Sequence, residues 1–529
     1  LVLAGGDVHI RDNSTLHVVG DAIFGAGELS FDTTIGNWDT LDIDGNLSQS
    51  TATIGSTTAQ SRIYCAGDWL AASPFTLDSG WVYLDGPGVI GGPAPTFKRL
   101  QLTSGLRTVQ TDAEISGTLR STGGTTDGGA WLECVDSTTE PVQTTGNLIH
   151  RLRVAGGTIP FLNTLVDELE LTGGTLHLND NATLTVQDEA RLIGGTLGFD
   201  TFVGNWDTLD VQGDLVQTGT VVGTTTSVSR IYVAGNWSAD TPFELPNGWV
   251  HFDGGDSIIG GAAPAFRRLS LVSGVTSVAT EATVSGTITS SGGTTAGPEW
   301  LTMIGGTEPL STGSHLVALL RFQAGTVSSN NVLLGELELT GGTLSINDNA
   351  TVTVDGDARL ISGNLAFNTT VGNFDTLHVN GSLLQTGAVC SASTSVSRIY
   401  CAGDWSSNST FGMASGTVYL DGDGELGGSV PGLDPTFPTL RVTGGTVRTV
   451  SSAATLSAGL VDVDLGNRLV IDGGDLTLVG APVTIDGALS VKAASTLRAD
   501  GASPITIHGV GKLELVGDAA QPAVLAGVA

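Results

Sequence analysis

The sequence predicts an all-β protein, a parallel β-solenoid built from three tandem units of about 168 residues with no significant helix. Three observations carry this prediction. The same phrases occur three times at one spacing, and short runs of alternating apolar and polar residues fill the chain. No linker rich in Pro, Ser or charge marks the joins between the copies.

The repeat is clearest in two phrases. GNWDTLD begins at Gly36 and at Gly204, and GNFDTLH begins at Gly372, so the two intervals are equal (204 − 36 = 372 − 204). SRIY begins at Ser61, Ser229 and Ser397 with the same interval. We therefore expect repeat units at 1–168, 169–336 and 337–504, the third diverging after about residue 450, and a continuing coil over 505–529.

The alternation within each unit is that of strands with one buried face. Leu176 and Leu178 share one parity, and Leu184 and Val186 share one parity in the next run. Pairs such as GG, DN and DG separate runs of four to six residues, and no stretch of a dozen residues has helical spacing. The expected elements are therefore short strands joined by tight turns.

Two all-β architectures fit short strands of this kind. Tandem sandwiches or barrels would need linkers between units, whereas a solenoid stacks each coil on the last and needs none. We favour the solenoid, with coils of roughly 20 to 28 residues and six to eight coils in a unit.

The charge limits the classes of partner. The chain has 53 acidic and 21 basic residues, a formal net charge of −32. Such a surface repels nucleic acid phosphates and anionic lipid headgroups, so we expect neither as a partner. No run of 18 apolar residues occurs, so the sequence also predicts no membrane span.

The phrases RIYCAGDW, GWVYLDGPGVIGG, PTFKRLQLTSG and AEISGTLRSTGG, between Arg62 and Gly124, resemble the Gly- and Thr-rich β-solenoid repeats of large bacterial secreted surface proteins. Those are the filamentous-haemagglutinin and autotransporter-passenger kind. The resemblance implies an exported, elongated, non-enzymatic body used for adhesion, surface coating or fibre building. It carries no catalytic residue to this sequence.

The aromatic and arginine columns have two interpretations each. The nine Trp residues fall in repeated columns or their near-equivalents. They could be platforms on which sugars stack, but we favour the interpretation that they are packing or loop-anchoring residues copied by duplication. The arginines of the SRIY phrase are expected to point outward. They could bind anionic ligands, but we favour the interpretation that each pairs with a carboxylate on an adjacent coil. These arginines are Arg62, Arg230 and Arg398.

The four cysteines are expected to be small core residues. Cys65 and Cys401 occupy the column of Val233, and Cys390 occupies that of Val222. A disulfide between Cys390 and Cys401 is the alternative. No CxxC pair or His column indicates a metal.

If the protein binds a small ligand, the sequence favours calcium. The acidic runs 421–425 (DGDGE) and 42–46 (DIDGN) alternate oxygen ligands with small residues, but turn chemistry explains them equally well. Sequons repeat at Asn13, Asn181 and Asn349 and would matter in an exported, glycosylating context. We therefore assign no catalytic, cofactor-binding or metal residue and no cofactor.

Enzyme motifs are sparse. The sequence has no GxSxG, P-loop or HExxH phrase. His508-Gly509 is similar to a polygalacturonase-type motif, but the paired-Asp phrases that accompany it in that family are not recognisable. Abundant carboxylates keep open an alternative, a carbohydrate-active (pectate-lyase- or polygalacturonase-like) β-helix enzyme with a unique acid cluster in one unit, or a glycan-binding module.

The sequence as a whole favours a non-enzymatic, exported structural or adhesive protein of the bacterial cell surface or extracellular space. We expect a stiff acidic rod or fibre that acts through end-to-end or lateral self-association and through matrix or glycan contact. Leu1 has the phase of Leu169 and Leu337 within the repeat, so we expect a mature product or a piece of a longer protein.

Overall fold

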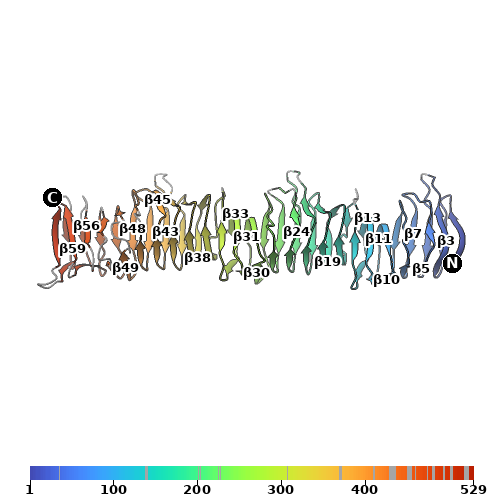
Figure 1. Cartoon of the computed structure of the whole chain (residues 1–529), viewed down its shortest axis with the longest axis horizontal. Coiled ribbons are helices and arrows are strands. Elements are labelled where there is room, and N and C mark those ends of the chain that lie inside the picture. Colours follow the sequence, from blue (N-terminus) through green and yellow to red (C-terminus); the bar gives the residue numbers. More distant parts are fainter. Residues whose placement is uncertain are drawn as a thin grey trace. The chain divides into compact units, whose positions relative to one another are not determined.

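The computed structural model describes the chain except for residues 35, 137–140, 201, 203, 224, 227, 307, 368–371, 409–411, 428–435, 450–454, 459, 473–474, 479–482, 493–494, 501–503, 517–522 and 529. The described residues form 62 strands and no helix, and neighbouring strands pair in parallel (Figure 1). No helix in this part of the chain is available to cross a membrane. The predicted all-β parallel solenoid is thus confirmed.

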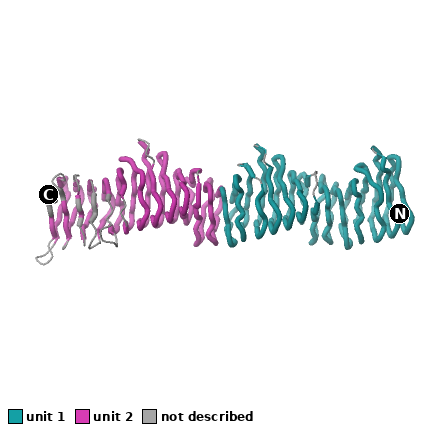
Figure 2. Tube along the Cα trace, turned by 45° about the horizontal axis from the view of Figure 1, so that its top comes forward, with its two compact units in different colours: residues 1–267 teal, residues 268–529 magenta. Residues whose placement is uncertain are grey.

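The chain divides into two compact units, residues 1–267 and 268–529 (Figure 2). Each unit is a stack of parallel turns. The strands recur at the spacing seen in the sequence: β7 (Arg62–Cys65), β27 (Arg230–Val233) and β46 (Arg398–Cys401) start at equal intervals (230 − 62 = 398 − 230). The predicted unit boundaries at 168, 336 and 504 stay a prediction.

A turn in unit 1 has three sides, each belonging to one stack of paired strands. On the first side, β27 lies between β24 and β29 in one-to-one register. The three stacks are β21 (Thr183–Val186), β24 (Thr208–Val211), β27 and β29 (Trp249–Phe252); β22 (Ala190–Leu192), β25 (Leu215–Gln217), β28 (Trp237–Ala239) and β30 (Ser257–Gly260); and β20 (Thr175–Leu178), β23 (Thr196–Phe199) and β26 (Val221–Val222).

Unit 2 repeats this three-sided turn with the corresponding strands. Its stacks are β40 (Thr351–Val354), β43 (Thr376–Val379), β46 and β48 (Thr417–Leu420); β41 (Ala358–Leu360), β44 (Leu383–Gln385), β47 (Trp405–Ser407) and β49 (Gly424–Gly427); and β39 (Thr343–Ile346), β42 (Asn364–Phe367) and β45 (Val389–Ala392). The first stack continues through β51 (Leu440–Val442), β54 (Val461–Val463), β57 (Val483–Ile485) and β60 (Ile505–Ile507).

The remaining strands continue the same stacking within each unit. In unit 1 they are β1 (Val2–Ile10), β2 (Thr15–Val18), β3 (Ala22–Phe31), β4 (Thr40–Ile43), β5 (Leu47–Gln49), β6 (Thr53–Ile54), β8 (Trp69–Ala71), β9 (Trp81–Leu84), β10 (Gly88–Gly91), β11 (Thr96–Leu102), β12 (Leu106–Val109), β13 (Ala113–Ser121), β14 (Thr125–Asp127), β15 (Leu132–Cys134), β16 (Val142–Gln143), β17 (Leu148–Val154), β18 (Thr158–Leu162) and β19 (Thr164–Leu171). The division falls within β31 (Ala265–Leu271). In unit 2 they are β32 (Val275–Val278), β33 (Ala282–Ser290), β34 (Thr294–Ala296), β35 (Leu301–Met303), β36 (Leu316–Phe322), β37 (Thr326–Ser329), β38 (Val332–Leu339), β50 (Thr436–Phe437), β52 (Thr446–Thr449), β53 (Thr455–Ala458), β55 (Arg468–Ile471), β56 (Asp475–Leu478), β58 (Ala488–Val491), β59 (Thr496–Asp500), β61 (Lys512–Leu515) and β62 (Val524–Val528).

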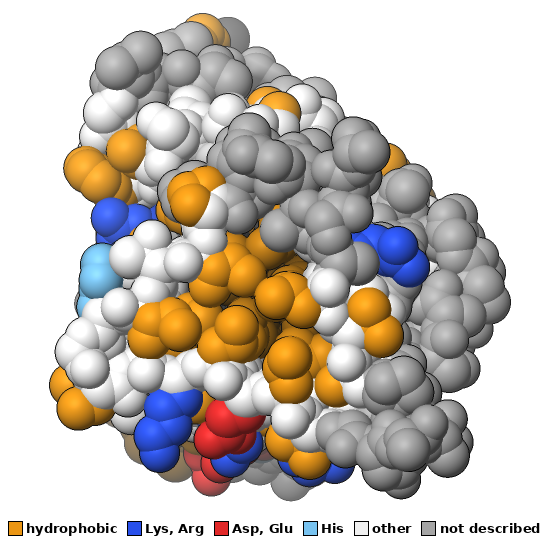
Figure 3. Space-filling view, turned by 90° about the vertical axis from the view of Figure 1, so that its left-hand side faces the viewer, with side chains coloured by type: hydrophobic (Ala, Val, Ile, Leu, Met, Phe, Trp, Pro, Cys, Tyr) orange, Lys and Arg blue, Asp and Glu red, His pale blue; other side chains and the backbone are white. Residues whose placement is uncertain are grey.

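Alternation along each strand decides which side chains form the core. In β27, Ile231 and Val233 are buried whereas Arg230 and Tyr232 are partly exposed, as the period of two predicts. The buried residues of all three sides meet inside the turn, and Figure 3, which looks onto one end of unit 2, shows apolar side chains gathered at the centre with polar and charged ones around them. Burial of this apolar interior drives the folding of each unit.

The turns vary in length. Leu152 pairs with Leu169 on the next turn, a sequence separation of 17, whereas Leu184 pairs with Leu209, a separation of 25. The shortest turns are therefore shorter than the roughly 20 residues that we expected. The reason is that turns such as those around β17 and β19 connect their strands with few corner residues.

A ladder is the series of strands that pair in register from one turn to the next. When the turns are followed along such a ladder, one sequence repeat does not correspond to a whole number of turns. The ladder that holds β7 runs through β9, β11, the end of β13, β16, β18, β20 and β23 to β26. It does not include β27, the strand that carries the same phrase as β7 in the next copy and that follows β24 on another ladder. Equivalent phrases therefore lie on different ladders, which the sequence repeat alone did not indicate.

We predict that two tryptophans of the second repeat, Trp237 and Trp206, differ in their effect on stability. Trp237 is fully buried and packs against Phe243, Phe252 and Phe266 at ring-centroid distances of 5.7, 6.3 and 5.2 Å. Trp237→Ala should therefore lower the free energy of unfolding by about 3–5 kcal/mol, measured by urea denaturation. Trp206→Ala is the matched control, because this side chain is 49% exposed, and its loss should be about 1 kcal/mol. Equal losses would contradict the assignment of the core.

Candidate functional site

The outward side chains of β7, β27 and β46 form an arginine and aromatic group in each copy. In the first copy, Arg62 lies over the ring of Trp38, 3.8 Å from its centroid, and over the ring of Tyr83 at 5.8 Å. Arg230 lies over Trp206 at 3.9 Å, and Arg398 lies over Phe374 at 5.0 Å. We call these three groups the arginine platforms: Trp38 with Arg62, Trp206 with Arg230, and Phe374 with Arg398.

The expectation that these arginines pair with carboxylates on adjacent coils is wrong for all three. Among the described residues, the side chains of Arg62 and Arg398 make no hydrogen bond or ion pair, and the Arg230 side chain donates only to the Tyr232 hydroxyl, at 3.3 Å. The preceding loop offers an aromatic ring instead. Each guanidinium is thus held by its face, and its N–H groups remain available at its edge.

The aromatic columns separate into a core column and surface columns. Trp69, Trp237 and Trp405 are at most 1% exposed, which confirms the packing interpretation for this column. Trp38 and Trp206, in contrast, are about half exposed, so core packing does not describe them, and the choice between loop anchoring and sugar stacking stays open for this column. Alternation cannot distinguish these cases, because Trp38 precedes its strand and lies in a loop.

An Asn in each copy fixes the loop that carries the platform ring. Asn13 accepts a hydrogen bond from the Trp38 backbone N–H at 2.7 Å, and Asn181 accepts one from the Trp206 N–H at 2.8 Å. Asn349 does the same for Phe374 at 2.8 Å. All three have positive φ angles, which Asn tolerates better than most residues. The repeated sequon residues thus serve a structural purpose here, since their side chains are already engaged.

A stacked aromatic pair adjoins each arginine. Tyr64 stacks on Tyr83 with centroids 4.5 Å apart, and Tyr400 stacks on Tyr419 at 4.4 Å. The second copy replaces one tyrosine, so that Tyr232 stacks on His251 at 4.5 Å. Burial, with a smaller contribution from the nearby Arg230 charge, lowers the pKa of His251 to about 4.

A second group of polar residues lies near the last strands of the stack that holds β46. Val463, Ile485 and Ile507 are register partners, and the residues that follow them are Asp464, Asp486 and His508. We call Asp462, Asp464, Asp486 and His508 the acid column. His508 Nδ1 lies 3.7 Å from an Asp486 oxygen.

Arg441 ties two carboxylates of the acid column together. Its Nη2 lies 2.9 Å from an Asp462 oxygen and 3.1 Å from an Asp464 oxygen. Burial raises the pKa of Asp462, the Arg441 charge opposes this shift, and the charges of Asp464 and Asp486 add to it. The two carboxyls thus share one cation in unequal surroundings, since the Asp462 side chain is 21% exposed and that of Asp464 is 38% exposed.

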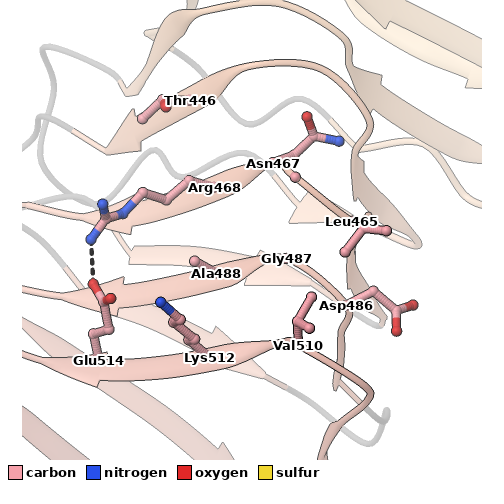
Figure 4. Close-up of a pocket in the computed structure, with 11 residues that line it drawn as sticks. Thr446, Leu465, Asn467, Arg468, Asp486, Gly487, Ala488, Val510, Lys512 and Glu514 are labelled. Atoms are coloured by element: carbon pink, nitrogen blue, oxygen red, sulfur yellow. Dashed lines mark hydrogen bonds and ion pairs between the residues drawn. The ribbon is translucent and has the colours of Figure 1, made fainter.

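A shallow cleft of about 370 Å³ adjoins the acid column (Figure 4). Asp486 lines it, together with Arg468, Lys512 and Glu514. Arg468 is paired with Glu514 and also donates to the Ser490 hydroxyl at 2.7 Å. In Figure 4 the Asp486 carboxylate lies on the opposite side of the cleft from this ion pair. The cleft thus presents both charge signs to a ligand.

The cysteines are in the reduced state. Cys65, Cys134 and Cys401 are buried, as expected for core residues, and Cys390 is partly buried. All four are free, so the alternative of a bridge between Cys390 and Cys401 is wrong. Burial raises the pKa of the Cys65 thiol to about 11 and of the other three to about 12, which keeps them protonated at neutral pH.

The acidic runs that suggested calcium are used in contacts between turns. Asp44 lies 3.0 Å from His17 Nε2, and Asp423 accepts the Thr446 backbone N–H at 2.5 Å. Asp421 lies 3.4 Å from His378 Nε2. In the part of the chain that the structure describes, no group of three or more His, Cys, Asp or Glu side chains is arranged to hold a metal ion. Calcium binding stays a prediction.

His251 gives a prediction of pH dependence. Its folded pKa of about 4 lies below the ordinary value of 6.5, so acid protonates the unfolded chain first. Stability should therefore fall as the pH drops from about 6.5 to about 4, by on the order of 3 kcal/mol at most, measured as the unfolding midpoint at each pH. His251→Tyr recreates the pair of the other copies and should remove this part of the pH dependence. Identical pH profiles for the two proteins would contradict the assignment.

Comparison with known proteins identifies no relative. No protein-family model, no curated protein and no solved structure matches the chain. The arginine platforms and the acid column are therefore interpreted from their own geometry and chemistry.

Proposed function

We propose that this chain is a non-enzymatic, exported structural or adhesive repeat protein. It acts as a stiff acidic solenoid at the cell surface or in the extracellular space, through self-association and through contact with a surface or matrix. The observation that carries the proposal is the outward face of the stacks, which presents equivalent groups once in each repeat on a rigid support of parallel strands.

The ladder of backbone hydrogen bonds supports a structural role, because it makes the stack of turns rigid. Within unit 1, for example, the strand of Arg230 is bonded to the strands of the turns before and after it. A residue at any turn is thereby fixed relative to the next turn, which suits repeated contacts with an extended partner. The charge of −32 keeps such a body soluble and separates copies at low ionic strength.

The test of self-association uses salt. Because like charges hold copies apart, assembly should increase when the Debye length shortens from about 30 Å at 0.01 M to about 8 Å at 0.15 M salt. Analytical ultracentrifugation and electron microscopy of the purified chain would then show multimers whose share rises with protein concentration. A monodisperse monomer at every salt and protein concentration would contradict the proposed assembly.

A second candidate function is favoured by the acid column. Two carboxyls in unequal surroundings beside a cleft are what the hydrolysis of a glycosidic bond requires, one as acid and one as base or nucleophile. Asp462, whose pKa is raised, is the candidate acid, and Asp464 is the candidate base. Asp462, Asp464 and Asp486 lie where the sequence of the third repeat diverges from the other copies, and this is where the carbohydrate-active alternative would place a unique acid group.

A reducing-sugar assay on a panel of neutral and acidic polysaccharides distinguishes the two functions. The structural proposal predicts no release of reducing ends by the wild-type chain. The enzyme alternative predicts release that Asp462→Asn and Asp464→Asn each abolish. Asp44→Asn is the control, because this exposed carboxylate contacts His17 on another turn and should leave any activity unchanged. Release that survives both acid-column variants would exclude this group as the active site.

A further inference from the structure

The three arginine platforms differ in one respect from the cation–π contacts of Arg153 and Arg321. Arg153 lies over Trp131 at 4.8 Å but also binds Glu170 at 2.6 Å, and Arg321 lies over Trp300 at 5.0 Å and binds Glu338 at 2.6 Å. In a chain with 53 acidic residues, these arginines find a carboxylate on a neighbouring turn. The platform arginines do not, among the described residues.

An arginine without a hydrogen-bond partner carries a cost that a ligand would remove. The guanidinium has five N–H donors, and a buried donor without a partner destabilises the folded state. The Nε of Arg230 is buried and makes no hydrogen bond in the structure. The Nε of the ion-paired Arg151 and Arg441 is unbonded in the same way, so the groups available to a ligand are the terminal N–H groups of the platform arginines, to which the described residues offer no carboxylate.

The ring under each guanidinium determines the kind of acceptor. Stacking at 3.8 Å on Trp38 and at 3.9 Å on Trp206 fixes the plane of the guanidinium and leaves its edge for hydrogen bonding. A planar carboxylate matches this edge, because it accepts two parallel N–H bonds. A lone inorganic anion would use the charge but not the apolar surface beside it.

The exposed ring surface points to a sugar. Trp38 is 50% exposed, Trp206 is 49% exposed and Phe374 is 47% exposed, so each platform offers an apolar surface next to a cation without a carboxylate partner. A uronic acid has a carboxylate and, on the same ring, a face of C–H groups that can cover an aromatic side chain. An Asp or Glu side chain from a second copy would bring the carboxylate without the apolar face.

We propose that Arg62, Arg230 and Arg398, each held on an aromatic ring, bind the carboxylate groups of uronic-acid-containing glycans. This inference rests on the proposed function and deepens it, because it names the class of matrix partner. The strands β7 and β27 lie on separate hydrogen-bonded ladders, so their platforms are separate sites. The surrounding negative charge favours short oligosaccharides over long polyanions as probes.

The test is isothermal titration of the full chain with a tetrasaccharide of galacturonic acid in 0.15 M salt. The wild-type chain should bind it at three sites. Substitution of Arg62, Arg230 or Arg398 by Gln should remove one site each, and the triple variant should lose binding at least tenfold. Arg62→Lys should also weaken its site, because Lys keeps the charge but loses the paired N–H groups.

Three controls make the result specific. Arg153→Gln changes an arginine that also stacks on a tryptophan but is already ion-paired, so it should leave binding unchanged. The methyl ester of the tetrasaccharide, which lacks the charge, should bind at least tenfold more weakly, and inorganic phosphate at the same concentration should not compete. Circular dichroism of each variant establishes that it is folded.

Several outcomes would overturn the proposal. They are absent binding by the wild-type chain, unchanged binding by the triple variant, an equal loss on Arg153→Gln, or equal binding of the methyl ester or of phosphate. If the wild-type chain forms multimers and the triple variant does not, the partner of the platforms is a second copy of the chain and not a glycan. Failure here leaves the salt-dependent assembly of the proposed function untouched, and failure of assembly leaves glycan binding untouched, so the two are distinguishable.

Discussion

The constraint on which the structure depends is the parallel hydrogen-bond ladder between successive turns. Because the ladder fixes each residue directly over its partner, the inward or outward direction of a side chain is inherited from turn to turn. Inside, the three sides bring together close-packed side chains that are mostly apolar, such as Ile231 and Val233. Outside, residues such as Arg230 and Tyr232 can differ between turns, and the arginine platforms lie on that face.

The sequence predicted the ladder but not the way in which it winds. Alternation and the constant repeat spacing led to the all-β solenoid, and columns such as that of Trp237 led to the core, because local periodicity follows directly from strand geometry. The number of residues in each turn is set by the corners between strands, which have no period. For that reason the sequence did not indicate that β7 and β27 lie on different ladders.

The platforms show the same limit at the level of the site. From the sequence, Arg62 was correctly placed on the outer face, but its partner was wrongly expected to be a carboxylate. Composition favours a carboxylate in so acidic a chain. The partner is instead Trp38, held in place by the side chain of Asn13 from the preceding turn. A contact between a strand and a loop one turn away leaves a signal in the sequence only as the joint repetition of the two residues.

The solenoid architecture also explains how one chain can hold repeated and unique groups together. Each turn contacts chiefly its two neighbours, so a change of outward residues affects one or two turns and leaves the core of the others intact. The acid column required only that polar residues follow Val463, Ile485 and Ile507 on successive turns, while Val463 and Ile485 keep the core as before. Duplication therefore preserves the scaffold strictly, while a binding or catalytic group can be gained in one copy at little cost in stability.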